Sequence, residues 1–492
     1  MYSMLKRHIS LIATFVVCMI VVGFLQFSGP GLAGNDGYYH IAMASLVWDQ
    51  GLPVAFPYLE FTLLDQAHFV DTHMLFHVFQ APFTAFLDLE TAAKLSSSIF
   101  IALAFSLFVW LLKQYDIPYP LFWALLLLVS SESFLYRMMM PRPPIFALIY
   151  TWLAFHFLMQ RKFVLLAVIA CLFTWTYKSF FILFPMACIA MLVFYVANKE
   201  VNFKPLLAVG TGVVAGLLIN PFFPDNIFFL VDALRMKIFA GGFNIAVGNE
   251  WYPFKTLTLL KDSAIPLAAY LVGIVLTNRD EWKADPHRLF WFLLATLWLL
   301  MVFKSRRFIE FFPPAALLFF IFAMKPWAQR FSWASLYQRR VWWFPAVLMV
   351  LLLGLAGYKT LHGEYQKMQK KAPVNAYQGG ALWLAKHTPA GSTVFHTDWD
   401  DFPRLFFHNR HNHYIVGLDP DYMRLKDAAR YDLWKRISKG KIKHPADLIR
   451  NQFGAEYVFT DKKHKRFIKI AKRSPRMKLV FSDKYSMVYR VQ

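Results

Sequence analysis

Long apolar runs separated by short polar stretches occupy the first three quarters of the chain. A membrane-crossing helix needs roughly 20 mostly apolar residues, and about eleven stretches approach that length. The fifth and sixth share one apolar run, so the count can change by one or two. They lie near residues 9–28, 92–112, 119–135, 143–159, 162–176, 179–197, 203–221, 257–277, 288–303, 308–324 and 341–358. The pattern predicts a polytopic α-helical membrane protein.

From residue 359 onward the apolar runs stop, and short helical and alternating segments follow one another. Strands are predicted at 392–396, 413–417 and 455–459, with two more closing the chain; helices are predicted near 376–388, 400–408, 421–438, 444–452 and 462–472. This reads as a soluble α/β domain over 359–492, after a membrane domain over 1–358.

Basic residues between the runs predict the orientation of the spans, because short cytoplasmic loops are rich in Lys and Arg. With the N-terminus inside, the basic flanks all fall on the cytoplasmic side: Lys113, Arg161-Lys162, Lys199/Lys204, Arg279/Lys283/Arg288 and the 325–340 segment. This alternation requires that residues 72–87 form a helix at the outer interface without crossing. It predicts a large external loop at 29–91, an external segment at 222–256 and an extracytoplasmic C-terminal domain.

Composition agrees with this architecture and excludes an ordinary soluble protein. The chain has 492 residues, of which 58% are hydrophobic and only 17% charged, and its mean hydropathy is +0.40. The three cysteines, Cys18, Cys171 and Cys188, all fall in predicted spans, so a disulfide framework is not indicated. The first span follows Lys6-Arg7-His8 and lacks a small-residue cleavage site, which favours an anchor over a signal peptide.

The formal net charge of +22 is concentrated in the tail, where 27 Lys and Arg stand against 12 Asp and Glu from residue 359 onward. A basic domain beside a membrane suits anionic headgroups or an acidic acceptor. No aromatic-basic nucleic-acid module is present, so nucleic acid is not an expected partner.

A short acidic and aromatic stretch, Gly34-Asn35-Asp36-Gly37-Tyr38-Tyr39-His40, follows the first predicted span. Taken alone, Asp36 reads as a solvated loop acid. The stretch resembles the first-external-loop motif of GT-C glycosyltransferases, and most closely that of oligosaccharyltransferase catalytic subunits. The resemblance implies that Asp36 lies at an active centre, with Tyr39 and His40 beside a bound acceptor.

Several basic residues lie on the predicted external side, where short loops should carry few of them. They are Arg137, Arg142, Lys178, Lys304, Arg306 and Arg307. Cations that converge on one cavity at membrane depth suit a phosphate. The alternative is that lysines such as Lys178 reach headgroups at the membrane surface. The resemblance places a donor-phosphate arginine at the start of a comparable late span, which Arg306 or Arg307 matches, and Arg142 and Lys178 are further candidates.

Two more stretches match the same resemblance. The run from Val247 to Pro253 is similar to a fifth-external-loop motif whose glutamate approaches the catalytic centre, which implies that role for Glu250; by itself Glu250 is a polar loop residue. Trp399-Asp400 stands where the resemblance implies an acceptor-binding motif. Asp400 and Asp401 can equally be helix N-caps.

A divalent metal, Mg²⁺ or Mn²⁺, is left open by the sequence. The resemblance implies acidic ligands, for which Asp36, Glu132 and Glu250 are the candidates, yet the second external loop between Ser133 and Pro144 lacks Asp. The cluster Asp65, His68, Asp71 and His73 has metal-like spacing, but no third motif supports it, so supporting or interfacial roles are expected.

Together these features predict a GT-C glycosyltransferase that moves a sugar or glycan from a polyprenyl-phosphate or -diphosphate carrier to a glycan, lipid or protein acceptor. Direct displacement with inversion at the sugar is expected, in the bacterial inner membrane, with the active site outside. The alternatives are a flippase or transporter of a lipid-linked glycan, for which the expected internal repeat is not evident, and a non-catalytic scaffold.

Overall fold

The structure is a computed structural model that describes residues 2–239, 248–277, 282, 285–330 and 343–492. Contacts divide the chain into two compact units. Unit 1 comprises Met1–Gly29, Lys94–Leu217 and Ala246–Lys370, and unit 2 comprises Pro30–Ala93, Leu218–Ile245 and Lys371–Gln492. Val247, Arg279, Lys283 and residues 331–340, which entered the sequence predictions, lie outside the described residues.

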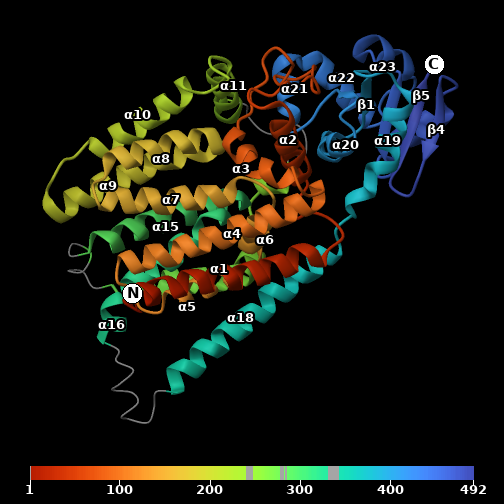
Figure 1. The fold of residues 1–492 in the computed structure, drawn as a ribbon. Coiled ribbons are helices and arrows are strands. Elements are labelled where there is room, and N and C mark those ends of the chain that lie inside the picture. The colour runs from red at the N-terminus through yellow and green to blue at the C-terminus, as the bar shows by residue number, and fades with distance from the viewer. Residues whose placement is uncertain (1, 240–247, 278–281, 283–284, 331–342) are drawn as a thin grey trace. The chain divides into compact units, whose positions relative to one another are not determined.

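Unit 1 is helical. Its elements in chain order are α1 (Tyr2–Ser28), α4 (Leu89–Gln114), α5 (Pro120–Val129), α6 (Glu132–Met139), α7 (Pro144–Met159), α8 (Phe163–Thr176), η1 (Lys178–Ile182), α9 (Leu183–Asn198), α10 (Lys204–Leu218), η2 (Asn249–Trp251), α12 (Thr256–Asp262), α13 (Ala264–Val275), α15 (Pro286–Lys304), η3 (Arg306–Glu310), α16 (Phe312–Arg330) and α18 (Trp343–Gln369). Figure 1 shows α1, α4, α7, α8 and α15 running side by side.

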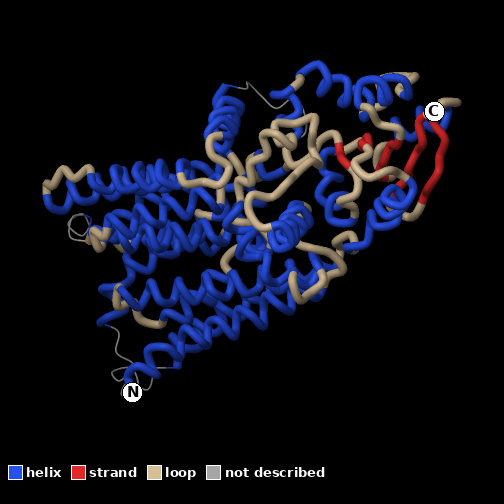
Figure 2. Tube along the Cα trace, turned by 45° about the horizontal axis from the view of Figure 1, so that its top comes forward, coloured by secondary structure: helices blue, strands red, loops and turns tan. Residues whose placement is uncertain are grey.

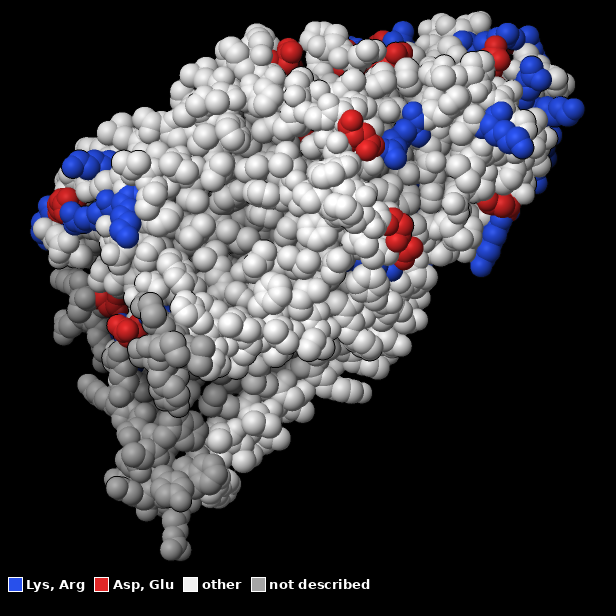
Figure 3. Space-filling model, viewed as in Figure 1, with Lys and Arg blue, Asp and Glu red and all other residues white. Residues whose placement is uncertain are grey.

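The apolar runs of the sequence are the helices of this unit. Among the described residues, five helices are long and apolar enough to cross a membrane, or seven if each of two bent pairs counts as one span. Shorter apolar helices, including α7, α8 and α10, add to these. On the face shown in Figure 3, the described surface over the middle of these helices carries no Lys, Arg, Asp or Glu, and charges gather at their left end. Over its described residues each predicted stretch is mainly helical, with 119–135 and 257–277 each broken in two, and the number of spans stays a prediction.

Close packing of α8 on α10 depends on two small residues. A Cβ added at Gly212 would collide with the backbone of Ala167, and one added at Gly216 would collide with Thr174. The short distance also lets the Trp175 indole donate to the Gly216 carbonyl at 2.6 Å. Small residues that allow backbones to approach are the usual device of helix pairs in membranes.

Two helices of unit 1 are broken, and one carboxylate joins the breaks. The pair α5 and α6 is bent by 90°, and the pair α12 and α13 by 81°. Asp262, at the second break, accepts from the Ser131 hydroxyl at 2.7 Å and the Ser133 amide at 2.8 Å, at the first break. The Ser133 amide at the first break is thus satisfied inside the protein, as a broken span requires.

Helix direction places two groups of charges at opposite ends of unit 1. α8 has 14 residues, which corresponds to about 21 Å at the usual helical rise. It separates Arg161 and Lys162 from Tyr177, and η1 with α9 separates Lys178 from Lys199. The loop cations at 161–162 and 199 therefore lie away from the end where Tyr177 and Lys178 are found.

Unit 2 contains a five-stranded sheet (strands red in Figure 2). The strands are β1 (Thr393–His396), β2 (His413–Tyr414), β3 (Tyr457–Asp461), β4 (Met477–Ser482) and β5 (Ser486–Val491). Their order is β2-β1-β3-β5-β4, with β1 parallel to β2 and β3, and β5 antiparallel to β3 and β4. Phe395, Val458 and Tyr489 belong to the buried core of this unit.

The helices of unit 2 come from three parts of the chain. They are α2 (Asp36–Gln50), α3 (Met74–Thr84), α11 (Asp225–Phe239), η4 (Val374–Tyr377), α19 (Gln378–His387), η5 (Trp399–Asp401), α20 (Phe402–His408), α21 (Pro420–Lys426), α22 (Ala428–Ser438), α23 (Ala446–Phe453) and α24 (Lys465–Arg473). α19 packs against β4 and β5, and α23 packs against β1 and β5. Every helix and strand predicted for the tail has a counterpart here.

The predicted domains, 1–358 and 359–492, stay a prediction, and two features of the structure bear on the boundary between them. Helix α18 continues to Gln369, so the expected boundary at 358/359 lies inside a helix. The first loop, which was assigned to the membrane domain, belongs to the same compact unit as the tail. Backbone hydrogen bonds join them, from Tyr414 to the Tyr58 carbonyl at 2.9 Å and from Leu63 to the Tyr422 carbonyl at 3.2 Å.

Candidate functional site

Three arginines of unit 1 surround the carboxylate of Glu250. Arg137 donates to Glu250 Oε2 at 2.9 Å, Arg142 Nη1 lies 3.6 Å from the same oxygen, and Arg307 Nη1 lies 3.8 Å from Oε1. Their side chains are between 9% and 21% exposed. We call Arg137, Arg142 and Arg307 the arginine cage. It gathers guanidinium groups from α6, the loop before α7, and η3 around one anion.

Short irregular elements hold the cage in position. Ser305, which precedes η3, donates its hydroxyl to the Glu250 carbonyl at 2.7 Å, and so ties η3 to η2. Arg307 donates to the Tyr177 hydroxyl at 2.6 Å, and its guanidinium lies 5.2 Å from the centre of the Trp251 ring. Aromatic rings and a hydroxyl thus fix this guanidinium without neutralising it.

A second glutamate supports the cage from behind. Glu310 is fully buried, and its Oε1 accepts from Arg137 Nε at 2.6 Å and from a second nitrogen of the same guanidinium. Its Oε2 is buried without a hydrogen-bond partner among the described residues. Arg137 is therefore held between two carboxylates. The three arginines carry three positive charges and Glu250 and Glu310 carry two negative charges, so the site has one formal positive charge in excess.

Electrostatics keep Glu250 ionised. Burial by itself would raise the pKa of Glu250, but Arg142, Arg307 and Arg137 together lower it well below its usual range. Burial likewise opposes the charged form of Arg307, whereas Tyr177, Glu250 and Glu310 raise its pKa. A carboxylate with so low a pKa is a weak proton acceptor. This argues against Glu250 as a general base.

The other predicted donor-site cations lie outside the cage. The Arg306 guanidinium donates to the Pro253 carbonyl at 3.1 Å and lies 5.3 Å from the Phe254 ring, so it holds the loop after η2. Lys178 directly follows Tyr177 at the start of η1 and is partly exposed. Of the four predicted cations, the structure brings Arg142 and Arg307 together around Glu250.

Glu250 and Glu132, two of the three predicted metal ligands, are both engaged by basic side chains. Glu250 is enclosed by the arginine cage, whose charges would repel a cation. Glu132 is engaged elsewhere, in a 2.5 Å ion pair with Lys367. Among the described residues, no group of three His, Cys, Asp or Glu side chains has a metal-binding arrangement. Asp36, the third predicted ligand, belongs to unit 2.

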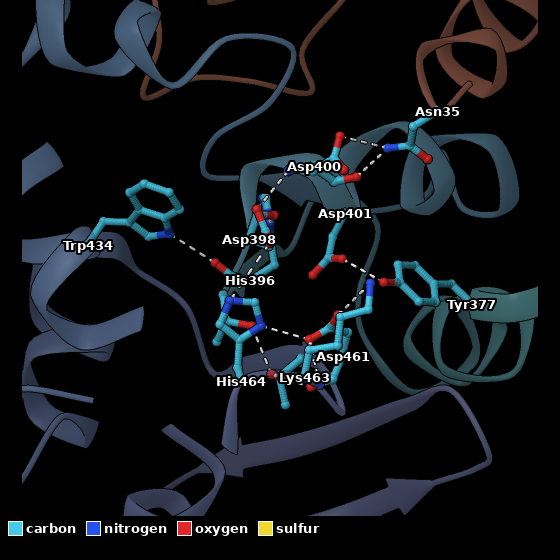
Figure 4. Close-up of polar contacts among 12 residues, drawn as sticks. Asn35, Tyr377, His396, Asp398, Asp400, Asp401, Trp434, Asp461, Lys463 and His464 are labelled. Atoms are coloured by element: carbon cyan, nitrogen blue, oxygen red, sulfur yellow. Dashed lines mark hydrogen bonds and ion pairs between the residues drawn. The ribbon is translucent and has the colours of Figure 1, made fainter. Parts of the chain in front are cut away.

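Unit 2 gathers acidic side chains where β1 and β3 end (Figure 4). Asp398, Asp400 and Asp401 follow β1, and Asp461 ends β3. Because β1 and β3 are parallel neighbours, their carboxyl ends meet at one edge of the sheet, the usual position of a binding crevice in an α/β fold.

Asp36 is the half-buried first residue of α2, next to this acidic edge. Asn35 donates to the Asp400 carbonyl at 2.6 Å and to its carboxylate at 2.9 Å. Asp400 is an exposed residue, although protein atoms crowd its carboxyl group and Asp36 and Asp398 lie near it. Burial of that group, together with the charges of Asp36 and Asp398, raises the pKa of Asp400 to about 6. Asp36 and Asp400, both predicted site residues, are thus close enough to interact.

The inner part of the acidic edge is buried. Asp401 is 3% exposed; its Oδ1 accepts from the Tyr377 hydroxyl at 2.8 Å, and its Oδ2 lacks a partner among the described residues. Burial raises the pKa of Asp401 well above its usual value, and Asp398 and Asp461 raise it further. Asp461 is paired with His464 at 2.7 Å.

Other predicted residues of unit 2 have structural surroundings. Trp399 packs against the core of the unit. The N-cap of η5 is Asp398, whose carboxylate accepts from the Asp400 amide, so neither Asp400 nor Asp401 supplies a capping side chain. Tyr39 is 5% exposed and packs among Phe402 and other rings, which places it in the core and not on a surface that an acceptor can reach.

Histidines near these acids also have partners within unit 2. Both ring nitrogens of His396 face backbone groups, at 2.7 Å from the Asp398 carbonyl and 3.4 Å from the Val416 amide, which leaves neither for a metal. In the first loop, Asp65 pairs with His68 and with Lys426 of α21. Asp65 of that cluster thus attaches the loop to the tail.

Sequence reasoning missed two members of the unit 1 site and underused a third. Arg137 was one of the externally placed cations but was not assigned to a phosphate. Glu310 and Tyr177 were not singled out. The signal for Glu310 was present, since an acid three residues after Arg307 in an apolar run needs a buried cation as partner. Tyr177 gave no such signal among so many aromatics.

No model of a known protein family matches the sequence, and no curated protein matches it. Solved structures do match the fold. An oligosaccharyltransferase from Archaeoglobus fulgidus in its apo form has 14% identity and a TM-score of 0.65, with 98% of this chain and 74% of that chain covered. The same archaeal enzyme, AglB, in complex with an inhibitory peptide and dolichol-phosphate has 13% identity and a TM-score of 0.64, with coverage of 99% and 74%.

A second enzyme has the same fold over its whole length. ArnT from Cupriavidus metallidurans bound to undecaprenyl phosphate has 14% identity and a TM-score of 0.59, with 97% of each chain covered. Likeness at this identity concerns the fold, and it matches the resemblance carried by residues 34–40. The chain therefore has the fold of the GT-C glycosyltransferases, which are membrane enzymes.

Proposed function

We propose that this chain is a GT-C glycosyltransferase that transfers a sugar or glycan from a polyprenyl-phosphate or -diphosphate carrier to an acceptor, with the arginine cage of unit 1 as the site of the departing phosphate. The observation that carries the proposal is the convergence of three guanidinium groups on the Glu250 carboxylate. Arginines present planar forks of donors that fit carboxylate and phosphate alike. The solved structures of AglB with dolichol-phosphate and of ArnT with undecaprenyl phosphate support a carrier of this class.

Glu250 occupies the cage as a counter-ion in this proposal. A phosphate group brings more negative charge than a carboxylate, and the cage with Glu310 carries a surplus of positive charge. The phosphate therefore exchanges with the Glu250 carboxylate, and Glu310 continues to orient Arg137. This assignment replaces the catalytic role that the resemblance implies for Glu250, because a carboxylate with a strongly lowered pKa takes up protons poorly.

The proposed reaction is a direct displacement. The acceptor nucleophile attacks the anomeric carbon, the bond from that carbon to the phosphate oxygen breaks, and the electron pair leaves with the phosphate. Cations already in position stabilise the charge that develops on this oxygen. Asp36 of unit 2 is the proposed base that takes the acceptor proton. Asp400, whose pKa is about 6 beside Asp36, is proposed to hydrogen-bond the acceptor.

Lipid binding tests the cage directly. The full-length protein in lipid nanodiscs is titrated with undecaprenyl phosphate and with dolichyl phosphate, and Arg307→Gln is compared with Arg161→Gln. Arg161 is the matched control, since it forms an exposed 2.6 Å pair with Glu200 away from the cage. A charge-assisted hydrogen bond contributes about 1.5–3 kcal/mol, so Arg307→Gln should weaken binding by about 10- to 100-fold. Equal binding by the two variants would refute the cage as a phosphate site.

Transfer tests the enzyme class. Membranes that contain wild-type protein or Asp36→Asn are supplied with radiolabelled polyprenyl-phosphate sugars, and the label is followed from carrier to acceptor. The proposal expects transfer by the wild type and a loss of about 10²-fold or more in the variant, which is the usual contribution of a general base. Movement of the labelled lipid across the bilayer without cleavage from its carrier would instead identify a flippase.

A further inference from the structure

A buried chain of hydrogen bonds in unit 2 links an aspartate to two histidines. Asp71 Oδ2 lies 2.6 Å from His77 Nδ1, and His77 Nε2 lies 2.8 Å from His40 Nδ1. Asp71, His77 and His40 are 2%, 0% and 4% exposed. His40 is on α2, His77 is on α3, and Asp71 precedes α3, so the chain crosses the contact between these helices. The proposed function assigns no role to these three residues.

The two hydrogen bonds restrict where protons can be. With Asp71 ionised, His77 Nδ1 carries a proton and donates it to the carboxylate. His77 Nε2 then accepts from His40 Nδ1 when both rings are neutral. One further proton on His40 Nε2 allows the Nδ1 proton to shift to His77. The result is a His77 imidazolium paired with Asp71, while His40 is neutral again as its other tautomer.

The Asp71 carboxylate accepts from His77 and from the His73 amide at 2.9 Å, both of which are neutral donors. Burying a carboxylate without an opposite charge is costly, and an imidazolium at His77 supplies that charge. The titratable groups that face the chain from packed elements are Tyr39 of α2 and His73, whose rings lie 5.3 Å and 5.1 Å from that of His40. Tyr422 of α21 lies behind Tyr39.

We propose that Asp71, His77 and His40 form a proton relay that takes up the acceptor proton from Asp36 during each transfer and returns it through Asp36 to water when the product has left. His40 follows Asp36 by four residues on α2, which places both on one face of the helix. The proton leaves the Asp36 carboxyl for His40 Nε2, the Nδ1 proton of His40 moves to His77 Nε2, and Asp36 becomes a carboxylate during the transfer. When the product has left, the same steps in reverse release the proton to water from half-buried Asp36. His40 exchanges the proton with Asp36, and Asp71 and His77 are positioning residues that act through it. This inference rests on the proposed role of Asp36.

A purely structural bridge between α2 and α3 would not need the carboxylate. Two neutral histidines can share one hydrogen bond and hold the helices together. The buried Asp71 carboxylate, 2.6 Å from His77 Nδ1, is an addition that such a bridge does not require. Holding the tautomer and stabilising the imidazolium are the tasks of the aspartate in a catalytic Asp-His pair.

The first experiment needs no glycosyl transfer. Full-length protein with ¹⁵N-labelled histidine is titrated in nanodiscs, and imidazole nitrogen shifts are recorded by NMR, with His40→Gln and His77→Gln used to assign the two rings. The relay predicts that His77 Nδ1 stays protonated at all pH values and that one proton changes the signals of both rings together. Two separate titrations, one for each ring, would overturn it, as would an unchanged titration in Asp71→Asn.

The second experiment separates relay from packing in the active protein. Asp71→Asn should lower kcat by about 10²-fold with KM changed by no more than about twofold, and should move the acidic limb of the kcat–pH profile. His68→Gln is the control, because His68 is an exposed histidine of the same loop. A loss of activity with an unchanged pH profile assigns Asp71 to packing and refutes the relay. If the wild type transfers no sugar, the proposed function fails, and the NMR titration still decides whether the proton chain exists.

Discussion

Replacing Glu250 by Gln tests whether this residue competes with the donor phosphate or helps to bind it. The substitution keeps the size of the side chain and an oxygen that can accept from Arg137, but it removes the negative charge. If Glu250 occupies the place of the phosphate, the variant should bind undecaprenyl phosphate more tightly than the wild type. It should also be less stable in the absence of lipid.

The magnitude follows from the geometry of the cage. Guanidinium nitrogens lie 2.9, 3.6 and 3.8 Å from the carboxylate oxygens, and a pair of charges about 4 Å apart interacts with about 4 kcal/mol at an effective dielectric constant of about 20. Desolvation offsets much of this attraction, so the loss of the charge should lower the free energy of unfolding by about 2–5 kcal/mol. If about 1.4–2.8 kcal/mol of the pairing opposes lipid entry, affinity should rise about 10- to 100-fold.

Two measurements on the same preparations check both effects. Thermal unfolding without lipid gives the stability change, and titration with undecaprenyl phosphate in nanodiscs gives the affinity. Glu200→Gln is the matched control, because Glu200 forms an exposed pair with Arg161. The pKa of Glu250 is lowered, so its contribution is present above the pKa of an unfolded glutamate, about 4.3, and is lost only as pH falls through the lower folded value. Measurements at pH 7 therefore include the whole effect.

The counter-ion role predicts that Glu250→Gln increases the affinity for lipid, and the opposite change would refute it. Weaker lipid binding by Glu250→Gln, by a factor similar to that of Arg307→Gln, would mean that the carboxylate orders the arginines for the phosphate and does not compete with it. An unchanged affinity would mean that the phosphate binds elsewhere. Either result refutes the exchange of Glu250 for phosphate.

Three further substitutions test the framework by thermal unfolding. Asp262→Ala removes two hydrogen bonds to the start of α6 and should cost about 2–4 kcal/mol; an unchanged Tm would show that the broken helices do not depend on it. Gly216→Val should cost about 1–3 kcal/mol by collision with α8, whereas Gly210→Val, which points into open space, should not. Asp401 has a raised folded pKa, so stability should fall as pH rises above the unfolded value of about 3.9. Asp401→Asn should remove that fall in stability and raise Tm at pH 7. The control, Asp432→Asn at an exposed position, should do neither. A wild-type Tm that does not change with pH would contradict the reasoning.

The architecture was accessible from the sequence where one physical signal dominates. Apolar length predicts helices, and each predicted run is mainly helical over its described residues, because burying an unpaired backbone in an apolar environment is prohibitive. The alternating pattern of the tail sequence predicted its strands and helices in the right order. What the pattern could not give is the division into units, since the first loop joins the tail through backbone bonds such as that from Tyr414 to Tyr58. Contacts between distant segments leave no local period in a sequence.

The site was accessible to a lesser extent. The excess of cations on one predicted side of the spans singled out Arg142 and Arg307, which the structure places around Glu250. Hydropathy did not distinguish Arg306 from Arg307, although one holds a loop and the other faces the carboxylate. The bends that bring these residues together lie at short polar interruptions of two apolar stretches, at Ser130–Ser133 in 119–135 and at Lys261–Ser263 in 257–277. Apolar length alone treats each stretch as one helix, and it does not show that Asp262 joins the two bends.

Contacts of Glu310, Tyr177 and Asp262 would keep the shape of the cage when its anion changes. Guanidinium groups repel one another, so a cluster of three is stable only if fixed negative charges or dipoles hold it. Glu310 holds Arg137 through two nitrogens, Tyr177 holds Arg307, and Asp262 holds the bend from which α6 begins. None of these contacts involves Glu250, so exchanging its carboxylate for a phosphate leaves each of them intact. Positions fixed in advance are what charge stabilisation during the loss of a phosphate requires, because donors that need not reorganise contribute most.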